Sequence, residues 1–218
     1  MTKVFIIGAA GKVGRRLVRQ LADRGHQPCA LHRKPEQGDE LKALGATSVA
    51  GSLLELDAVE LARLMSGCEA AVFTAGAGGA GMELTNAIDG RGLELSVKAA
   101  KIAGIKRFIL VSVFPDALRG GPVSEGFENY IAVKRRAEVH LVETDLDWVI
   151  VRPGTLLEEP GTGKVHADVA ISYGEVPRDD VAATIVELIE APAVNQIIIE
   201  LTRGDMPVAE AVRRLARG

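Results

Sequence analysis

The sequence has few of the residues that build metal, redox and nucleic-acid sites. Its 218 residues include 2 cysteines and 4 histidines, and their spacing matches no metal-binding pattern. The net charge of -3 gives no electrostatic footprint for nucleic acid or an acidic membrane surface. The chain also lacks an apolar run long enough to cross a bilayer. We therefore expect no metal, no nucleic-acid partner and no membrane contact.

Short apolar strands alternate with helical segments along the whole chain. This alternation predicts parallel pairing, because each crossover needs a helix to return the chain. We predict a three-layer, doubly wound α/β fold with a mainly parallel sheet. A Gly/Pro-rich stretch after the sixth strand predicts a small C-terminal substrate lid, and we expect residues 1–218 to form a single domain. The expected strands are 3–9, 27–33, 46–52, 69–77, 106–113, 146–154 and 195–201. The expected helices are 12–24, 38–45, 56–65, 85–103, 128–143, 179–190 and 207–218.

The segment "KVFIIGAAGKVGRRLVRQL" places three glycines between the first strand and the first helix. Ligands of doubly wound sheets bind at the carboxyl ends of the strands, where this turn lies. Gly8 suits a tight turn, Gly11 lets the backbone approach a pyrophosphate, and Gly14 lets the helix pack on the strand. The helix N-terminus presents free N–H groups to the phosphates. These features predict a dinucleotide site, and its expected residues in this turn are Gly8, Ala10, Gly11, Lys12, Val13 and Gly14.

The end of the second strand is basic, with no carboxylate until Glu36. An acidic residue there would bind the ribose hydroxyls of NAD, whereas a basic residue accommodates the 2′-phosphate of NADP. Arg33, with Lys34 beside it, would donate charge-assisted hydrogen bonds to a phosphate. We therefore expect NADP(H) to be preferred, with NAD(H) as the alternative cofactor; a solvated basic corner is the alternative role for Arg33.

The turn after the fourth strand, "FTAGAGGAG", is rich in small residues. Thr74, Ala75 and Gly76 would leave room for a ribose and a pyrophosphate, because a larger side chain would block them. Tyr130 and Lys134 are four residues apart in "ENYIAVKRRAE", so a helix would place them on one face. Ser112 ends the fifth strand, on the cofactor side of the sheet.

Several motifs occur in a fixed order along the whole chain: GAAGKVG, AGS, FTAGAG, VSV, YIAVK, VRPG, PRDDVA and ELTRGDMPVAEAV. Together they resemble the atypical branch of the short-chain dehydrogenase/reductase superfamily. This NAD(P)H-binding branch includes NmrA-like proteins and biliverdin-IXβ/flavin reductase. The GxxGxxG spacing of the first motif is typical of the extended and atypical branches. The resemblance implies a Rossmann fold, with the strand order 3-2-1-4-5-6-7, and the nucleotide site, whereas activity varies within the branch.

The superfamily signature of Tyr-x-x-x-Lys with an upstream serine implies that Ser112, Tyr130 and Lys134 are catalytic. Tyr130 would supply a proton, and Lys134 would lower the tyrosine pKa from about 10 and hold the nicotinamide ribose. Ser112 would hydrogen-bond the substrate oxygen. Val111, Ser112 and Lys134 are also expected to contact the cofactor. The alternative is a surface helix on which Lys134 reaches into solvent.

Two further turns are implied by the resemblance. Members of the branch usually carry Gly-Asp after the third strand, against the adenine, where this chain has Ser52 in place of the acid. The Arg-Pro-Gly turn after the sixth strand passes beside the nicotinamide. Arg152 either contributes to the site beside the nicotinamide or has a structural role, paired with a carboxylate. Asp89 either lines the groove or is solvated. The expected cofactor contacts in these turns are Gly51, Ser52, Leu53, Pro153, Gly154, Thr155 and Leu156.

The resemblance leaves two principal functions. The first is an NADP(H)-dependent reductase of a small carbonyl, quinone or flavin-like acceptor, which the trio of Ser112, Tyr130 and Lys134 favours. The second is an NADP(H) redox sensor without catalysis. A sugar-nucleotide epimerase or dehydratase is less favoured, because that chemistry in this superfamily comes with a larger C-terminal domain.

The remaining expectations concern the setting of the protein. We expect a small-molecule substrate and a monomer or homodimer. The first strand begins almost at Met1, and Cys29 and Cys68 are far apart in the sequence, so we expect a cytoplasmic protein with reduced thiols.

Overall fold

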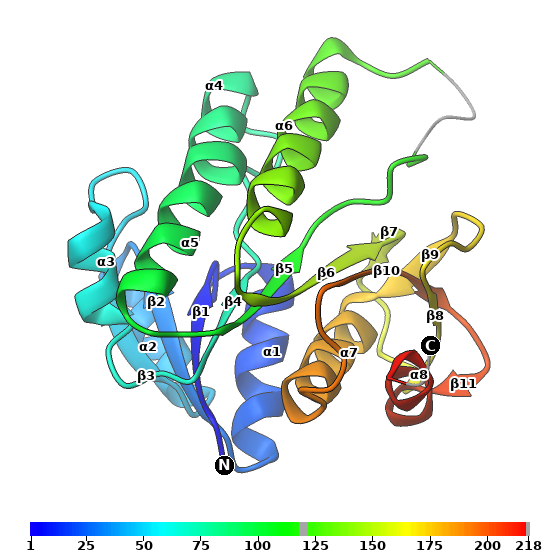
Figure 1. The fold of residues 1–218 in the computed structure, drawn as a ribbon, viewed down its shortest axis with the longest axis horizontal. Coiled ribbons are helices and arrows are strands. Elements are labelled where there is room, and N and C mark those ends of the chain that lie inside the picture. The colour runs from blue at the N-terminus through cyan, green and yellow to red at the C-terminus, as the bar shows by residue number, and fades with distance from the viewer. Residues whose placement is uncertain (118–121, 217–218) are drawn as a thin grey trace.

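The architecture is a mostly parallel sheet covered by helices on both faces (Figure 1). The computed structural model describes residues 1–117 and 122–216. The nine-stranded sheet has the order β11-β8-β10-β6-β5-β4-β1-β2-β3, and neighbouring strands from β10 to β3 are parallel. The predicted order 3-2-1-4-5-6-7 is confirmed, since the seventh predicted strand is β10. The strands of this sheet are β1 (Lys3–Ile7), β2 (Gln27–His32), β3 (Thr47–Ala50), β4 (Ala70–Phe73), β5 (Arg107–Val111), β6 (Asp147–Pro153), β8 (Lys164–Asp168), β10 (Ile197–Arg203) and β11 (Met206–Pro207).

Two hydrophobic cores lie on opposite faces of the sheet. Side chains of α1, α2, α7 and α8 pack on one face, and those of α3, α5 and α6 pack on the other. Figure 1 shows α1 beside α7, although the two helices are far apart in the sequence. The helices are α1 (Lys12–Asp23), α2 (Pro35–Ala43), α3 (Ala58–Leu64), α4 (Met82–Thr85), η1 (Asn86–Arg91), α5 (Gly92–Ile102), α6 (Glu125–Val142), α7 (Arg178–Glu190) and α8 (Val208–Leu215).

Local sequence explains where β1 and α1 begin and end. β1 is apolar and buried from Val4 to Ile7, as expected for a strand covered on both faces. Helix α1 starts after Gly11 and buries an apolar stripe that includes Leu17 and Leu21. It ends before Gly25, whose φ of 78° is readily adopted by glycine. The carboxyl end of β1 is therefore joined to the N-terminus of α1 by a turn of only a few residues.

The Gly/Pro-rich stretch contains three strands that the sequence patterns did not predict. β7 (Thr155–Leu157) pairs in parallel with β9 (Glu175–Pro177) in a separate two-stranded sheet. β8 extends the main sheet as an antiparallel neighbour of β10. The Tyr173 hydroxyl bonds to Thr155 Oγ1 at 2.6 Å, which links the segment before β9 to β7. These elements form a small structured region next to the carboxyl end of β6.

The helix predicted over residues 85–103 is interrupted in the structure. It starts at Met82 and contains a π-helical turn, η1, between α4 and α5. A π turn accommodates one more residue than an α turn and is often found at functional sites. This turn carries Asp89, which is 1% exposed. The solvated alternative for Asp89 is therefore wrong.

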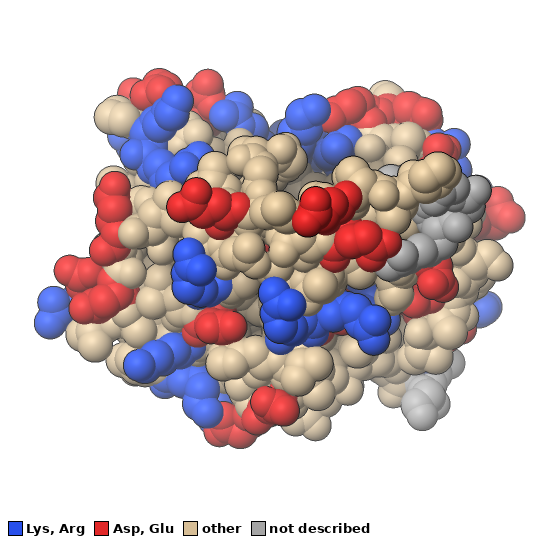
Figure 2. Space-filling view, turned by 90° about the horizontal axis from the view of Figure 1, so that it is seen from above, with Lys and Arg blue, Asp and Glu red and all other residues tan. Residues whose placement is uncertain are grey.

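The face seen from above, toward which the carboxyl end of β1 points, carries charges of both signs. Figure 2 shows Lys and Arg interspersed with Asp and Glu across this face. Among the helices of residues 1–117 and 122–216, none is long and apolar enough to cross a membrane.

Candidate functional site

The turn between β1 and α1 is held in a conformation that needs glycine. Gly8 has a φ of 87°, and its carbonyl accepts a hydrogen bond from Gly11 N at 2.9 Å. A Cβ on Gly8 would lie 2.4 Å from Ala75 N, and a Cβ on Gly14 would lie 2.3 Å from the Gly8 oxygen. Thr74 Oγ1 donates to the carbonyl oxygens of Ile7 and Gly8. The turn after β1 and the turn after β4 are thus packed backbone against backbone at the carboxyl ends of these strands.

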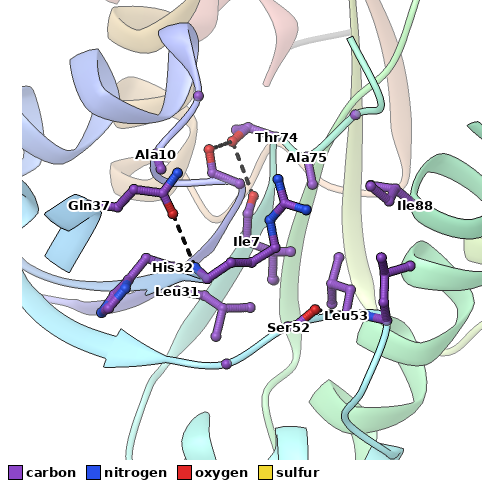
Figure 3. Close-up of a pocket in the computed structure, with 16 residues that line it drawn as sticks. Ile7, Ala10, Leu31, His32, Gln37, Ser52, Leu53, Thr74, Ala75 and Ile88 are labelled. Atoms are coloured by element: carbon purple, nitrogen blue, oxygen red, sulfur yellow. Dashed lines mark hydrogen bonds between the residues drawn. The ribbon is translucent and has the colours of Figure 1, made fainter. Parts of the chain in front are cut away.

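A cavity of about 260 Å³ opens at these turns (Figure 3). We call it the glycine-loop cavity. Figure 3 shows Thr74 and Ala75 on one side of it and Ser52 and Leu53 on another. Among the described residues that line it, none is a carboxylate. The lining residues are Ile7, Gly8, Ala10, Gly11, Leu31, His32, Arg33, Gln37, Gly51, Ser52, Leu53, Leu54, Thr74, Ala75, Gly76 and Ile88.

The basic turn after β2 is fixed by two side chains. Gln37 Oε1 accepts hydrogen bonds from Arg33 N at 3.2 Å and Lys34 N at 3.1 Å. His32 is buried, with Nδ1 bound to the Lys34 oxygen at 2.9 Å and Nε2 to Ser48 Oγ at 2.8 Å. Since the Gln37 oxygen is occupied by backbone donors, its amide nitrogen remains as a donor beside Arg33. Figure 3 shows the Gln37 oxygen directed toward this turn.

The predicted cofactor residues fall into two groups in the structure. Gly8, Ala10, Gly11, Arg33, Gly51, Ser52, Leu53, Thr74, Ala75 and Gly76 line the glycine-loop cavity. The others lie outside its lining: Lys12, Val13, Gly14, Lys34, Val111, Ser112, Lys134, Pro153, Gly154, Thr155 and Leu156. Gly14 and Val13 are buried in α1, whereas Lys34 is the N-cap of α2.

A second group of polar residues lies beyond the cavity, at the end of β5. We call Asp89, Ser112, Tyr130 and Lys134 the Lys134 cluster. Lys134 is 2% exposed, and its Nζ donates to the Val111 carbonyl at 2.9 Å. It also lies 3.8 Å from Asp89 Oδ1. The surface alternative for Lys134 is therefore wrong.

The charges of this cluster act on one another inside the protein. Burial lowers the pKa of Lys134, while Asp89 and Glu138 act to raise it. Burial raises the pKa of Asp89, and the Lys134 ammonium acts against this. Burial also raises the pKa of Tyr130, and the Asp89 carboxylate adds to the effect. The structure does not have the lowered tyrosine pKa that the resemblance implies, because burial, the larger cause, and the Asp89 carboxylate both raise the pKa of Tyr130.

Ser112 carries a buried hydroxyl with no partner among the described residues. Its residue is 5% exposed, and Oγ makes no hydrogen bond, although its backbone N–H donates to the Val151 oxygen at 2.7 Å. An unsatisfied buried hydroxyl is costly, so such atoms are rare in native structures. At the end of β5 this hydroxyl is suited to an oxygen or nitrogen of a bound molecule.

The polar groups of the Arg-Pro-Gly turn form hydrogen bonds mainly with other residues of the chain. Arg152 forms a bidentate pair with Glu138, at 2.9 and 2.6 Å, so of its two alternatives the structure has the carboxylate pair. The N–H groups of Gly154 and Thr155 donate to the carbonyls of Leu201 and Gly174. These two donors are therefore already used, while the turn itself stays at the carboxyl end of β6.

The segment after β7 reaches back to the start of α1. Glu158 pairs with Lys12 at 2.5 Å, with Arg16 at 3.4 Å and with Arg178 at 3.0 Å. Arg178 also donates to the Leu156 carbonyl at 3.0 Å, so it braces this segment. Asp180 accepts hydrogen bonds from Thr162 and Gly163 and fixes the same segment further along.

Sequence reasoning missed several residues of the site. His32 and Gln37 were not assigned a role, although Gln37 stands three positions after Lys34, at the spacing of a helix-capping pair. Leu31, Leu54, Ile7 and Ile88 line the cavity with apolar side chains that no motif marks. For Asp89 the sequence leaves two alternatives, lining the groove or solvation, and it gives no sign of the pairing with Lys134.

The chain belongs to the NAD(P)H-binding family, whose model matches residues 8–192. Its relatives include the protein named uncharacterized sugar epimerase YhfK of Bacillus subtilis, which is 40% identical over 98% of this chain and 100% of its own length. A solved structure from Bacillus halodurans, provisionally named an NAD-dependent epimerase/dehydratase, has a TM-score of 0.90 and 36% identity, covering 98% of this chain and 100% of its own. ChuY, named an anaerobillin reductase of Escherichia coli O157:H7, has a TM-score of 0.77 and 29% identity, covering 94% and 98%.

These matches confirm the resemblance to the atypical short-chain dehydrogenase/reductases and the NAD(P)-binding Rossmann fold. The residues present fit an NAD(P)H molecule. Gly8 and Gly14 carry no Cβ where the turn packs closely against neighbouring backbone, so the turn keeps its backbone accessible to a pyrophosphate. The Ser112 hydroxyl lacks a partner within the described chain. Family relatives include named reductases, so the family assignment supports oxidoreductase chemistry.

Proposed function

We propose that this protein is an NADP(H)-dependent reductase that acts on a small carbonyl, quinone or flavin-like acceptor. The observation that carries the preference for NADP(H) is the lining of the glycine-loop cavity. Arg33 lines it, and the described lining residues include no carboxylate that would bind the ribose hydroxyls or repel a 2′-phosphate. Arg33 would pair with the phosphate, and the Gln37 amide nitrogen would donate beside it.

The Lys134 cluster supports catalysis at the other part of the site. The bound cofactor would supply a hydride to the acceptor. Ser112 would donate a hydrogen bond to the acceptor oxygen through the hydroxyl that has no partner within the described chain. Tyr130, whose pKa is raised by burial and by Asp89, stays a phenol at neutral pH and would donate a proton to that oxygen. The phenolate would then regain a proton from water.

Binding and turnover of the purified protein test this proposal. Titration with NADPH and NADH, followed by cofactor fluorescence, is expected to show tighter binding of NADPH. Oxidation of NADPH in the presence of quinones, flavins and aldehydes is expected to exceed the rate without acceptor. Equal affinity for the two cofactors would contradict the role of Arg33, and binding without turnover would favour the redox sensor.

Epimerisation of a sugar nucleotide is a second candidate, favoured by the names of the Bacillus subtilis and Bacillus halodurans relatives. Such a reaction leaves no net oxidised cofactor. Incubation of the protein with sugar nucleotides, followed by chromatography of the sugars, separates it from reduction: a new epimer without NADPH consumption would support this candidate and contradict the reductase.

A further inference from the structure

The two cysteines of the chain meet on one face of the sheet. Cys29 lies on β2, and Cys68 precedes β4. β1 runs between these strands, and its Phe5 is paired with Cys29 on one side and with Ala71 on the other. Both cysteines belong to the hydrophobic core on the face covered by α3, α5 and α6. There the Cys68 thiol donates a hydrogen bond to the Cys29 sulfur.

The backbone around Cys68 is held by hydrogen bonds on both sides. Cys68 N donates to the Met65 carbonyl, just after α3, at 3.0 Å. The next N–H group, that of Glu69, donates to the Lys3 carbonyl of β1 at 2.8 Å. These bonds hold the turn before β4 against the core, so the contact between the two thiols is part of the fold.

Lys3 places a positive charge beside this pair. A Cβ on Gly67, the residue before Cys68, would lie 3.8 Å from Lys3 Nζ. The hydrogen bond from Cys68 lowers the pKa of Cys29 to about 7, and the Lys3 ammonium acts in the same direction, whereas burial opposes both. The hydrogen bond and burial raise the pKa of Cys68. Cys29 is therefore suited to react as a thiolate, with a protonated thiol as its neighbour.

Burial of the pair decides which oxidants reach it. Cys29 and Cys68 are 3% and 8% exposed. A bulky disulfide such as oxidised glutathione must bring its own sulfur into contact with the thiolate, which this burial hinders, whereas hydrogen peroxide presents only a small oxygen.

The pair is also separate from the cofactor site. Neither cysteine is among the described residues that line the glycine-loop cavity. Figure 1 shows the start of β1, where Lys3 lies, at the opposite end of the strand from the glycine turn. Chemistry at the two thiols is therefore independent of the proposed reduction.

We propose that Cys29 and Cys68 form a redox-active dithiol, which hydrogen peroxide converts to a disulfide within the chain. The Cys29 thiolate attacks one peroxide oxygen, the O–O bond breaks, and hydroxide leaves and takes a proton from solvent. The Cys68 sulfur then attacks the sulfenic acid at Cys29, so that the S–S bond forms, the S–O bond breaks, and water leaves with the Cys68 proton. Two thiols thus lose two electrons and two protons, and one peroxide becomes two molecules of water.

Peptide mapping of the wild-type protein tests this proposal, because the chain contains 2 cysteines. After treatment with hydrogen peroxide, digestion without reductant is expected to give the peptides of Cys29 and Cys68 joined, with about 2 Da less than their summed mass. Dithiothreitol is expected to separate them. The proposal is overturned if the peptides stay separate at a peroxide concentration that oxidises free cysteine. It is also overturned if non-reducing electrophoresis shows that the disulfide joins two copies of the chain.

Two variants test the order of the thiols with one probe, dimedone, which traps sulfenic acids. In Cys68→Ala the sulfenic acid at Cys29 has no second thiol to condense with, so we expect it to accumulate and to be trapped. In Cys29→Ala we expect little trapping, because Cys68 then lies buried without the thiolate partner. Trapping at Cys68 but not at Cys29 would overturn the assigned order.

The charge of Lys3 is tested by the rate of disulfide formation. Lys3→Met is expected to slow the reaction with peroxide by about threefold to tenfold, because the thiolate loses a neighbouring cation. Lys164→Met is the matched control, since Lys164 lies on β8, far from β1 in the order of the sheet, and it is expected to keep the wild-type rate. An equal rate in the two variants would contradict the role of Lys3.

The choice of oxidant has its own test on the wild-type protein. Oxidised glutathione is expected to form the disulfide at least about tenfold more slowly than hydrogen peroxide at the same concentration, and equal rates would overturn the assignment to peroxide. The peptide mapping needs no variant, so it decides the proposal even where a substitution in the core unfolds the chain. It also uses neither cofactor nor acceptor, so its outcome is independent of NADPH oxidation.

Discussion

The glycine-loop cavity and the Lys134 cluster are two parts of one site with opposite construction. The cavity is lined by backbone, small residues, apolar side chains such as Leu31 and Ile88, and an exposed cation, Arg33, and its described lining contains no carboxylate. The cluster is built around a pair of buried charges, Lys134 and Asp89, which are 2% and 1% exposed and face each other. Arg33 is therefore expected to serve a ligand with little effect on the fold, whereas Lys134 and Asp89 serve both.

The largest expected effect is on stability at the cluster. Lys134→Met leaves Asp89 buried without a partner and is expected to lower the free energy of unfolding by about 3–5 kcal/mol. Arg33→Met, at the exposed cation of the cavity, is expected to change it by less than about 0.5 kcal/mol. Urea unfolding followed by circular dichroism measures both. Equal losses of unfolding free energy in the two variants would contradict the proposed difference between the cavity and the cluster.

Turnover separates the two tyrosines. Tyr130→Phe is expected to lower kcat of acceptor reduction by about 10²–10⁴-fold, because the proton donor is removed. NADPH affinity is expected to stay near that of the wild type. Tyr173→Phe, which removes the hydroxyl bound to Thr155, is the matched control and is expected to keep kcat within about threefold. A Tyr130→Phe protein with full kcat on carbonyl acceptors would show that another group donates the proton.

Cofactor affinity tests the cavity. Arg33→Ala is expected to weaken NADPH binding by about 10–100-fold, as for a hydrogen bond between charged groups, and to leave NADH binding nearly unchanged. Gln37→Glu keeps an oxygen for the Arg33 and Lys34 N–H groups but adds a negative charge, so a smaller loss of NADPH affinity is expected. Lys34→Ala is the control, since Lys34 does not line the cavity. Isothermal titration calorimetry gives both constants, and a similar loss for NADH would contradict a phosphate-specific role.

The smallest expected effect is the response of kcat to pH. Because the pKa of Tyr130 is raised, the phenol persists above the ordinary tyrosine range and is lost only as pH rises through the shifted value. We therefore expect the proton-donating step to stay constant from about pH 6 to 9. Steady-state rates at saturating NADPH measure this. A fall in kcat through neutral pH would indicate a donor with a lowered pKa.

The same contrast explains what could be predicted from the sequence. The parallel pairing of the main strands follows from alternating apolar strands and helices, and their order is what the family resemblance implies. The glycine turn, whose parts are adjacent in the chain, indicates where the cavity lies. Asp89 and Lys134 meet only after η1 packs on α6, so no local pattern reports their pairing. The strands β7 and β9 are three residues each, too short to show a hydrophobic period, and they exist through pairing with each other.

The π turn η1 also bears on how this chain is to be aligned with shorter or longer relatives. Each residue of an α-helix turns by about 100°, so removing one residue from Asn86–Arg91 would rotate everything on one side of it by that angle. Asp89 would leave Lys134, although every residue type of the site remained in the sequence. In this segment a one-residue gap is as consequential as the loss of a catalytic side chain, and it leaves the usual motifs intact.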